Sequence, residues 1–340
     1  MTAPRDLVVI DADVLGRNRT GEETYVENLL RELPRVAPDL RFAAVTRHPA
    51  RVPAGVDAIE LPARLQEARM AWSLPRLLRA LRPRLAHFQH ALPLGWRGRT
   101  VVTLHDLHFE RDASAMALLD RLTFKTVVPR AARRADHVIA VSERTKRDAI
   151  ELYGIAPGKI TVTPHGVDPA FTPGGEHDAY LLYVGAIQQR KDPLAAADAA
   201  RAVGLPLVVA GPEKEPRVAR ELRARGADLR GWVDKPQLAE LYRGAAALVW
   251  PSRYEGFGLP VLEAMACGTP VVLSPDPALR EVAGDAAVYA EDGDYAAAVR
   301  RALADRPALA AKGIARARDF TWEEAARRTA DVYRRVLGAA

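Results

Sequence analysis

A glycine-rich loop between two glutamates is the part of this sequence best suited to chemistry. The loop starts at Glu255, just after an apolar run at 246–250 that has the composition of a buried strand, and Glu263 follows eight residues later. Pro260 suits the first turn of a helix, and Gly268 suits its end. We therefore expect a strand, a loop and a helix. The helix should begin next to the loop residues Gly256, Phe257, Gly258 and Leu259.

The chemistry of this loop favours a ligand that carries both an anion and hydroxyl groups. Backbone N–H groups at a helix N-terminus lack acceptors within the helix and attract anions such as a diphosphate. Carboxylates only accept hydrogen bonds, so the natural partners of Glu255 and Glu263 are hydroxyl groups. A nucleotide-sugar has both features. Taken singly, the two acids also permit a plainer interpretation, with Glu263 on a helix surface and Glu255 as an ordinary loop acid.

Two adjacent cations, Arg190 and Lys191, follow the strand predicted at 180–184 and its closing Gly185. They stand at the carboxyl end of a strand and just before a helix, which is where open α/β sheets bind ligands. Arginine offers a planar fork of donors and lysine a point charge, and both suit phosphate. The alternative is a pair of solvated loop cations.

Two residues of the first half of the chain occupy comparable positions. His105 ends the strand predicted at 100–104, so its side chain can reach a ligand or be held by neighbouring backbone groups. Gly21 begins the helix after the first strand, where a residue without a side chain lets the backbone approach a ligand closely.

Strands alternate with helical segments along the whole chain, which predicts parallel, doubly wound α/β sheets. The length of 340 residues favours two domains. A segment at 169–179 that contains prolines and glycines and has no apolar period is the expected linker. We therefore predict a first domain at 1–168, a second at 180–319 and a C-terminal helix at 320–340.

The composition excludes several classes of protein. Hydrophobic residues make up 49% of the chain and charged residues 27%, as in ordinary globular proteins. We find no signal-peptide pattern and no apolar run of the roughly 18–20 residues that span a bilayer, so we expect a cytoplasmic protein. The single cysteine, Cys267, excludes an internal disulfide framework and is interpreted as a packing residue. The spacing of His87, His90 and His108 matches no metal-binding pattern, so we expect no metal.

The net charge of +6 is concentrated in one region. Residues 64–147 contain 17 Lys and Arg against 7 Asp and Glu, a local excess of 10 (17 − 7). A solvated face in an arginine-rich protein is one interpretation. The other is a surface for an anionic acceptor or for peripheral contact at the inner face of the membrane. The basic residues are not interleaved with aromatic residues in a nucleic-acid motif, so we do not expect nucleic acid as a partner.

The string E-G-F-G-L-P-V-L-E-A-M-A-C-G-T-P-V-V at 255–272 resembles the glutamate-x7-glutamate signature of retaining glycosyltransferase family 4, also described as glycosyl transferases group 1. V-V-T-L-H-D-L at 101–107 is similar to a second family segment, as is the run from A-D-H-V-I-A-V-S through T-P-H-G-V-D at 135–168. The resemblance covers most of the chain. It implies the GT-B fold, in which two Rossmann-like domains face a cleft and the C-terminal helix crosses back onto the first domain.

The resemblance also implies roles for the candidate residues. Glu255 would hold the donor sugar, Glu263 the ribose and Lys191 the diphosphate, while His105 would lie near the sugar and the Gly21 loop would face the donor phosphates. Many members carry an arginine directly after the glycine that matches Gly185. This chain has Ala186 there, which leaves Arg190 as the substitute. Trp232 is interpreted as a packing residue, because members contact the base mainly through backbone groups.

The implied activity is that of a retaining hexosyltransferase without a metal or other cofactor. The Q-Q-R-K-D loop at 188–192 and the H-D-L segment at 105–107 look most like bacterial mannosyltransferases, which favours GDP-mannose and leaves UDP- and dTDP-sugars open. The expected acceptor is a glycan or a lipid-linked molecule in the synthesis of bacterial surface polysaccharide. A sugar-nucleotide epimerase of the same fold and a non-catalytic nucleotide-sugar-binding scaffold are the alternatives.

Overall fold

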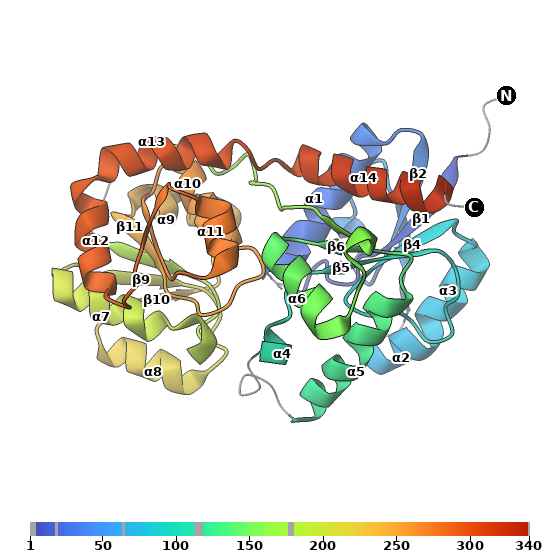
Figure 1. Cartoon of the computed structure of the whole chain (residues 1–340), viewed down its shortest axis with the longest axis horizontal. Helices are drawn as coiled ribbons and strands as arrows, with labels where there is room; N and C mark the ends of the chain where they lie inside the picture. The colour runs from blue at the N-terminus through green and yellow to red at the C-terminus, as the bar shows by residue number, and fades with distance from the viewer. Residues whose placement is uncertain (1–4, 18–19, 63–64, 112–117, 176–179, 339–340) are drawn as a thin grey trace. The chain divides into compact units, whose positions relative to one another are not determined.

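Two parallel sheets, each accompanied by helices, form the two units into which the chain divides (Figure 1). Unit 1 consists of Met1–Gly166 together with Trp322–Ala340, and unit 2 consists of Val167–Thr321. The predicted fold class of two Rossmann-like, doubly wound domains is confirmed. The computed structural model describes residues 5–17, 20–62, 65–111, 118–175 and 180–338.

The sheet of unit 1 has the strand order β3-β2-β1-β4-β5-β6-β7, and every pairing is parallel. Its strands are β1 (Asp6–Asp11), β2 (Leu40–Thr46), β3 (Asp57–Glu60), β4 (Leu85–Gln89), β5 (Thr100–Leu104), β6 (His137–Ala140) and β7 (Ile160–Val162). The central strands are short apolar runs with buried side chains, as expected of a parallel sheet covered by helices. Chain order reverses between β1 and β4, so this is the topological switch point of the sheet.

The helices of unit 1 come from both ends of the chain. They are α1 (Thr20–Val36), α2 (Gln66–Ala68), α3 (Leu74–Leu81), α4 (His108–Arg111), α5 (Leu118–Arg134), α6 (Glu143–Tyr153) and α14 (Trp322–Gly338). The C-terminal α14 packs against α1 of the same unit (Figure 1). The chain therefore returns to its first unit after completing the second.

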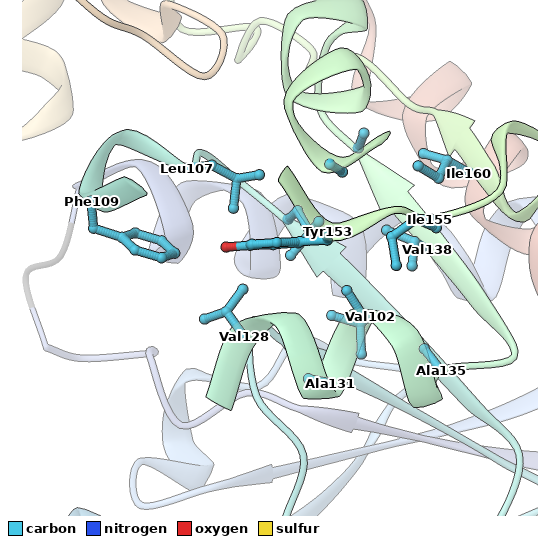
Figure 2. Close-up of a cluster of buried hydrophobic side chains, with 14 residues drawn as sticks. Val102, Leu107, Phe109, Val128, Ala131, Ala135, Val138, Tyr153, Ile155 and Ile160 are labelled. Atoms are coloured by element: carbon cyan, nitrogen blue, oxygen red, sulfur yellow. The ribbon is translucent and has the colours of Figure 1, made fainter. Parts of the chain in front are cut away.

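A hydrophobic cluster holds the segment that carries His105 (Figure 2). Side chains of β5, β6, α5 and β7 meet around Tyr153 of α6. Leu107 and Phe109, which lie just beyond His105 in the chain, are buried in this cluster. Burial of such side chains is worth roughly 1.5–3 kcal/mol each, so the chain after β5 is firmly anchored.

A buried polar network joins α14 to the sheet of unit 1. The hydroxyl of Tyr333 lies 2.6 Å from His87 Nδ1, and His87 Nε2 lies 2.7 Å from the hydroxyl of Thr103. Burial lowers the pKa of His87 to about 3, so its ring is neutral at pH 7. Both ring nitrogens have hydrogen-bond partners, which offsets the free-energy cost of burying them.

Replacing Tyr333 with phenylalanine should destabilise unit 1 by about 1–3 kcal/mol, because it leaves His87 Nδ1 buried without that partner. The free energy of unfolding can be measured by urea denaturation. Tyr289→Phe is the matched control, since its hydroxyl donates to Gly284 O at an exposed site. Equal stability of the two variants would contradict a structural role for the network.

The sheet of unit 2 has the order β10-β9-β8-β11-β12-β13 and is also entirely parallel. Its strands are β8 (Leu181–Val184), β9 (Leu207–Ala210), β10 (Asp228–Gly231), β11 (Ala247–Trp250), β12 (Val271–Leu273) and β13 (Ala287–Tyr289). Chain order reverses between β8 and β11. The short strand β13 lies outside the predicted strands: it has only three residues, which are partly buried at the edge of the sheet.

The helices of unit 2 are α7 (Pro193–Val203), α8 (Pro216–Ala224), α9 (Lys235–Gly244), α10 (Leu259–Ala266), α11 (Pro277–Ala283), α12 (Tyr295–Ala304) and α13 (Arg306–Ala317). The predicted start of α10 next to the glycine-rich loop is confirmed. Cys267 is 1% exposed, in agreement with a packing role. Trp232 is 57% exposed, so its interpretation as a packing residue is wrong: the indole follows the edge strand β10, where little of the protein covers it.

Candidate functional site

The switch point of unit 2 brings together two residues that are 64 positions apart in the chain. Lys191 follows β8 and Glu255 follows β11, and these two strands are neighbours in the sheet. Lys191 Nζ lies 3.0 Å from Glu255 Oε1. Open α/β sheets bind ligands outside the carboxyl ends of their strands at such a point.

A buried tryptophan supports this ion pair. Lys191 Nζ lies 4.7 Å from the ring centroid of Trp250, which in turn stacks on Tyr183 with ring centroids 5.1 Å apart. Gly185 leaves room for the indole, because a Cβ at this position would lie 2.5 Å from the Trp250 ring. Gly185 therefore has a packing role that is independent of its predicted role in donor binding.

Arg190 is buried and bonded to the glutamate loop. Its side chain donates from Nη1 to the carbonyl oxygen of Tyr254, and its own carbonyl accepts a hydrogen bond from Arg253 N at 3.2 Å. Arg190 Nε has no hydrogen-bond partner among the described residues. Arg190 thus connects the β8 loop to the β11 loop. Its contact with a donor phosphate stays a prediction.

Glu255 is buried beside these cations. Burial alone would raise the pKa of its carboxyl group, but Lys191, Arg190 and a hydrogen bond from Ser252 outweigh that effect and lower the pKa. The carboxylate is therefore ionised at neutral pH. A buried, ionised carboxylate can only accept hydrogen bonds, which suits the hydroxyl groups of a sugar.

The glycine-rich loop ends at a helix cap. Gly258 has φ +108° and precedes α10, and a Cβ at this position would lie 2.7 Å from Leu279 Cδ2. Phe257 is buried with its ring against Phe320, at a centroid distance of 5.8 Å. This packing sets the direction in which α10 begins at Leu259. Diphosphate binding by the N–H groups of residues 257–259 stays a prediction, as does the role of Gly256.

Glu263 is hydrogen-bonded to a tyrosine of α9 in the same unit. The hydroxyl of Tyr242 donates to Glu263 Oε2 at 2.9 Å. Burial raises the pKa of Glu263 to about 7, with the charge of Asp168 adding to the rise, while Tyr242 and Lys235 partly oppose it. Asp168 itself pairs with Lys235. Sequence reasoning did not find Tyr242, Asp168 or Lys235, because no motif joins their three segments.

The raised pKa of Glu263 predicts a pH dependence of stability. Its folded-state pKa of about 7 exceeds the ordinary value of 4.5, so its contribution is fully present below pH 4.5 and is lost as the pH rises to about 7. Glu263→Gln should therefore lose less stability than the unmodified protein between pH 5 and pH 8, by on the order of 2 kcal/mol. Urea denaturation at both pH values measures this difference. Glu240→Gln, which alters an exposed acid of α9, is the control, and identical pH profiles for the two variants would refute the prediction.

The switch point of unit 1 gathers a second group of polar side chains. His105 Nε2 lies 2.9 Å from Gln89 Oε1, and its ring lies edge-on to Tyr25 with centroids 4.8 Å apart. Burial lowers the pKa of His105 to about 4, so the ring is neutral at pH 7. Asp106 Oδ1 lies 2.7 Å from His108 Nδ1, and this hydrogen bond orients the loop after β5. Gly21 lies within α1, and a Cβ there would meet no atom within 4 Å.

Glu22 and His90 are neighbours of His105 that sequence reasoning did not identify as site residues: it did not single out Glu22, and it considered His90 only in a set with His87 and His108. Glu22 Oε1 lies 3.3 Å from His90 Nε2, and Glu22, His90 and His105 together are a group that could hold a metal ion. The three residues belong to separate segments, so their spacing in the sequence shows no motif.

No helix in the described part of the chain is both long and apolar enough to cross a bilayer.

Comparison with known proteins agrees with this architecture. Residues 19–171 match the family described as Glycosyltransferase Family 4, and residues 169–320 match Glycosyl transferases group 1. The structure is similar to that of the sucrose-phosphate synthase of Thermosynechococcus elongatus, with a TM-score of 0.82 at 21% identity over 99% of this chain and 100% of that one, which shows a shared fold.

Two curated relatives are similar in sequence over part of their length. The O-antigen chain mannosyltransferase B of Escherichia coli is 30% identical over 58% of this chain and 60% of its own length. The D-inositol 3-phosphate glycosyltransferase of Kineococcus radiotolerans is 34% identical over 60% of this chain and 58% of its own. This chain thus spans about three fifths of the relatives it matches. Because the two family matches together extend from residue 19 to residue 320, the chain belongs to glycosyltransferase family 4 and has the GT-B fold.

Proposed function

We propose that this protein is a retaining hexosyltransferase that moves a sugar from a nucleotide-sugar to a hydroxyl group of an acceptor. The observation that carries the proposal is the partly buried Lys191–Glu255 pair at the switch point of unit 2. A fixed cation beside an ionised carboxylate matches a ligand that joins a phosphate to a sugar. Family membership agrees with this chemistry.

In the proposed reaction, the bond between the anomeric carbon and the diphosphate oxygen breaks, and the acceptor oxygen bonds to the same carbon. The acceptor attacks on the face that the diphosphate leaves, so the anomeric configuration is retained, and the acceptor proton passes to the departing phosphate oxygen. Lys191, Arg190 and the N–H groups at 257–259 stabilise the leaving charge without a metal. Exclusion of water protects the donor from hydrolysis.

The remaining site residues bind the two substrates. Glu255 accepts hydrogen bonds from the donor sugar, and Glu263 accepts them from the ribose hydroxyls. Neutral His105 hydrogen-bonds the transferred sugar. Unit 2 holds the nucleotide-sugar and unit 1 the acceptor.

For the donor, we propose GDP-mannose, with UDP- and dTDP-sugars as the other possibilities. The name of the Escherichia coli relative points to mannose, and the 188–192 loop agrees with it. For the acceptor, we propose a glycan or a lipid-linked molecule of bacterial surface polysaccharide synthesis. The inositol phosphate relative shows that another acceptor class occurs among similar proteins.

A surface of unit 1 supports peripheral contact with a membrane. Trp72 is 78% exposed, and Leu94, whose backbone N–H bonds the carbonyl of Met70 at 2.8 Å, is 70% exposed. The segment 69–99 contains no Asp or Glu and seven arginines. Arg69 is buried and paired with Asp11, and Arg84 is paired with Asp6, which leaves Arg76, Arg79, Arg82, Arg97 and Arg99. Exposed apolar side chains beside unbalanced positive charge suit an anionic lipid surface.

Trp72→Ala should weaken binding to vesicles that contain anionic lipid, because it removes the largest exposed apolar side chain of this surface. Sedimentation with vesicles of phosphatidylglycerol and phosphatidylcholine measures the change. Trp232→Ala, which removes an exposed indole from unit 2, is the control. Equal binding of both variants would exclude this surface as the contact.

A thermal-shift panel tests the proposed donor site. GDP, UDP, dTDP and their sugar derivatives are added to the metal-free protein, and a ligand at about 100 times its Kd should stabilise the fold by roughly 2.7 kcal/mol. A preference for one base identifies the donor class. If no nucleotide stabilises well-folded protein, the transferase proposal fails.

Two other functions make different predictions. An epimerase would convert the donor to a new sugar-nucleotide with no acceptor present. A scaffold would bind nucleotide and show no turnover with any acceptor. Product analysis of donor alone, followed by donor with a pool of glycan acceptors, separates the three functions.

A further inference from the structure

Three potential metal ligands converge at the carboxyl edge of the unit 1 sheet. Glu22 lies in the first turn of α1, His90 directly follows β4, and His105 directly follows β5. One ligand atom from each side chain lies within 4.8 Å of the other two. The group lies at the switch point between β1 and β4, which is the position where sheets of this type bind ligands.

The spacing of the group is close to that of a metal site. Zinc binds nitrogen and carboxylate oxygen at about 2.0–2.2 Å, which puts the ligand atoms of a tetrahedral site roughly 3.3–3.5 Å apart. The separation of 3.3 Å between Glu22 Oε1 and His90 Nε2 meets this requirement. The third ligand has to approach by at most roughly 1.5 Å, which rotation of a side chain can supply.

The backbone and a neighbouring amide hold the two rings. His90 has φ +58°, in the left-handed region that residues other than glycine rarely adopt, and such strain collects at functional sites. His105 Nε2 lies 2.9 Å from Gln89 Oε1, so it donates to that oxygen and leaves the lone pair of Nδ1 for a ligand. A carbonyl oxygen that orients the second nitrogen of a histidine is typical of metal sites.

Two buried polar atoms add an independent observation. His90 Nδ1 and Gln89 Nε2 have no hydrogen-bond partner among the described residues, although burial without a partner is costly. His90 is a member of the group, and Gln89 directly precedes it in the chain. When His90 binds through Nε2, both atoms are N–H donors that cannot bind a cation themselves, and a water oxygen on the ion would be their natural acceptor.

The local charge favours a cation. The carboxylates of Glu22 and Asp106 both act electrostatically on the rings of His90 and His105. Arg69 also interacts with Glu22, but its guanidinium is bonded to Asp11 at 2.7 Å in the protein interior.

We propose that Glu22, His90 and His105 form a binding site for a zinc-class divalent cation. Two imidazoles and one carboxylate suit zinc and its first-row neighbours, whereas magnesium and calcium prefer oxygen ligands throughout. Three protein ligands leave a further position for water or a substrate hydroxyl group. One consequence rests on the proposed function, in which His105 hydrogen-bonds the transferred sugar: zinc bound to His105 competes with that hydrogen bond and inhibits transfer.

The test uses the full chain freed of metal with a chelator. Zinc is titrated by calorimetry and cobalt by visible absorption, which reports tetrahedral coordination. We expect one equivalent to bind. Glu22→Gln and His90→Ala should each weaken binding at least as much as the loss of an outer-shell partner, by about 10–100-fold. Glu22→Gln preserves the side-chain shape, so the test remains decisive if His90→Ala does not fold.

Matched variants of unit 1 control for surface binding. Glu27→Gln alters an acid of the same helix that pairs with Arg31, and His48→Ala removes an exposed histidine. Both should bind zinc as the unmodified protein does. Absence of zinc binding, or equal affinity in Glu22→Gln and Glu27→Gln, would overturn the site. Zinc binding without loss of transfer would overturn the inhibition alone, and the nucleotide panel tests the transferase proposal separately.

Discussion

Lys191→Ala is expected to lower kcat for sugar transfer by about 10²–10³-fold, the usual loss when one preorganised group that stabilises developing charge is removed. Lys191 Nζ lies 3.0 Å from Glu255 and over the Trp250 ring, so its charge is held in place before any ligand arrives. A fixed charge costs no reorganisation when the diphosphate leaves. Initial rates with saturating donor measure the loss.

Glu255→Ala should lose transfer as well, because the carboxylate that receives the sugar hydroxyls is gone. It also leaves Lys191 and Arg190 without the anion between them, so the fold of both variants is checked by circular dichroism. Lys214→Ala is the matched control, since it removes an exposed lysine of the same unit. Transfer rates that match this control in well-folded Lys191→Ala or Glu255→Ala would refute the site assignment.

Gly211→Ala is expected to destabilise unit 2 by about 3–5 kcal/mol, near the upper end of single substitutions. Gly211 has φ +147°, and a Cβ at this position would lie 2.0 Å from the carbonyl oxygen of Gly185 and 2.5 Å from its carbonyl carbon. Those are backbone atoms, which cannot rotate away as a side chain can. Gly185 in turn packs against Trp250, so the strain reaches the residue beneath Lys191.

Alanine substitutions at two other glycines distinguish the cost of a left-handed backbone conformation from the cost of a steric clash. Gly226→Ala has φ +81° and open space around the added Cβ, so it should cost only the roughly 1–2 kcal/mol of a left-handed conformation. Gly158→Ala has neither problem and should change the free energy of unfolding by less than about 0.5 kcal/mol. Urea denaturation ranks the three. A cost for Gly211→Ala no greater than that for Gly226→Ala would show that the Gly185 loop moves aside.

Sequence patterns predicted the elements of unit 2 well, because the signals are local. The apolar run before Glu255 is β11. The helix α10 begins at Leu259, as Gly258 before it and Pro260 in its first turn predict. The alternation of strands and helices gave the correct class of sheet. Trp232 was misjudged because exposure depends on which strand lies at the edge of the sheet, and no local pattern carries that information.

By itself, then, the sequence determined the parallel sheets, the glutamate loop and the family, since each rests on residues close together in the chain. Only the tertiary structure decided that Lys191 meets Glu255 and that Arg190 is buried and bonded to the carbonyl oxygen of Tyr254. It also brought Glu22 and His90 to His105. The physical reason is the order of strands in a doubly wound sheet. That order makes neighbours of strands whose sequences lie far apart, so the contacts at their carboxyl ends follow from the fold as a whole.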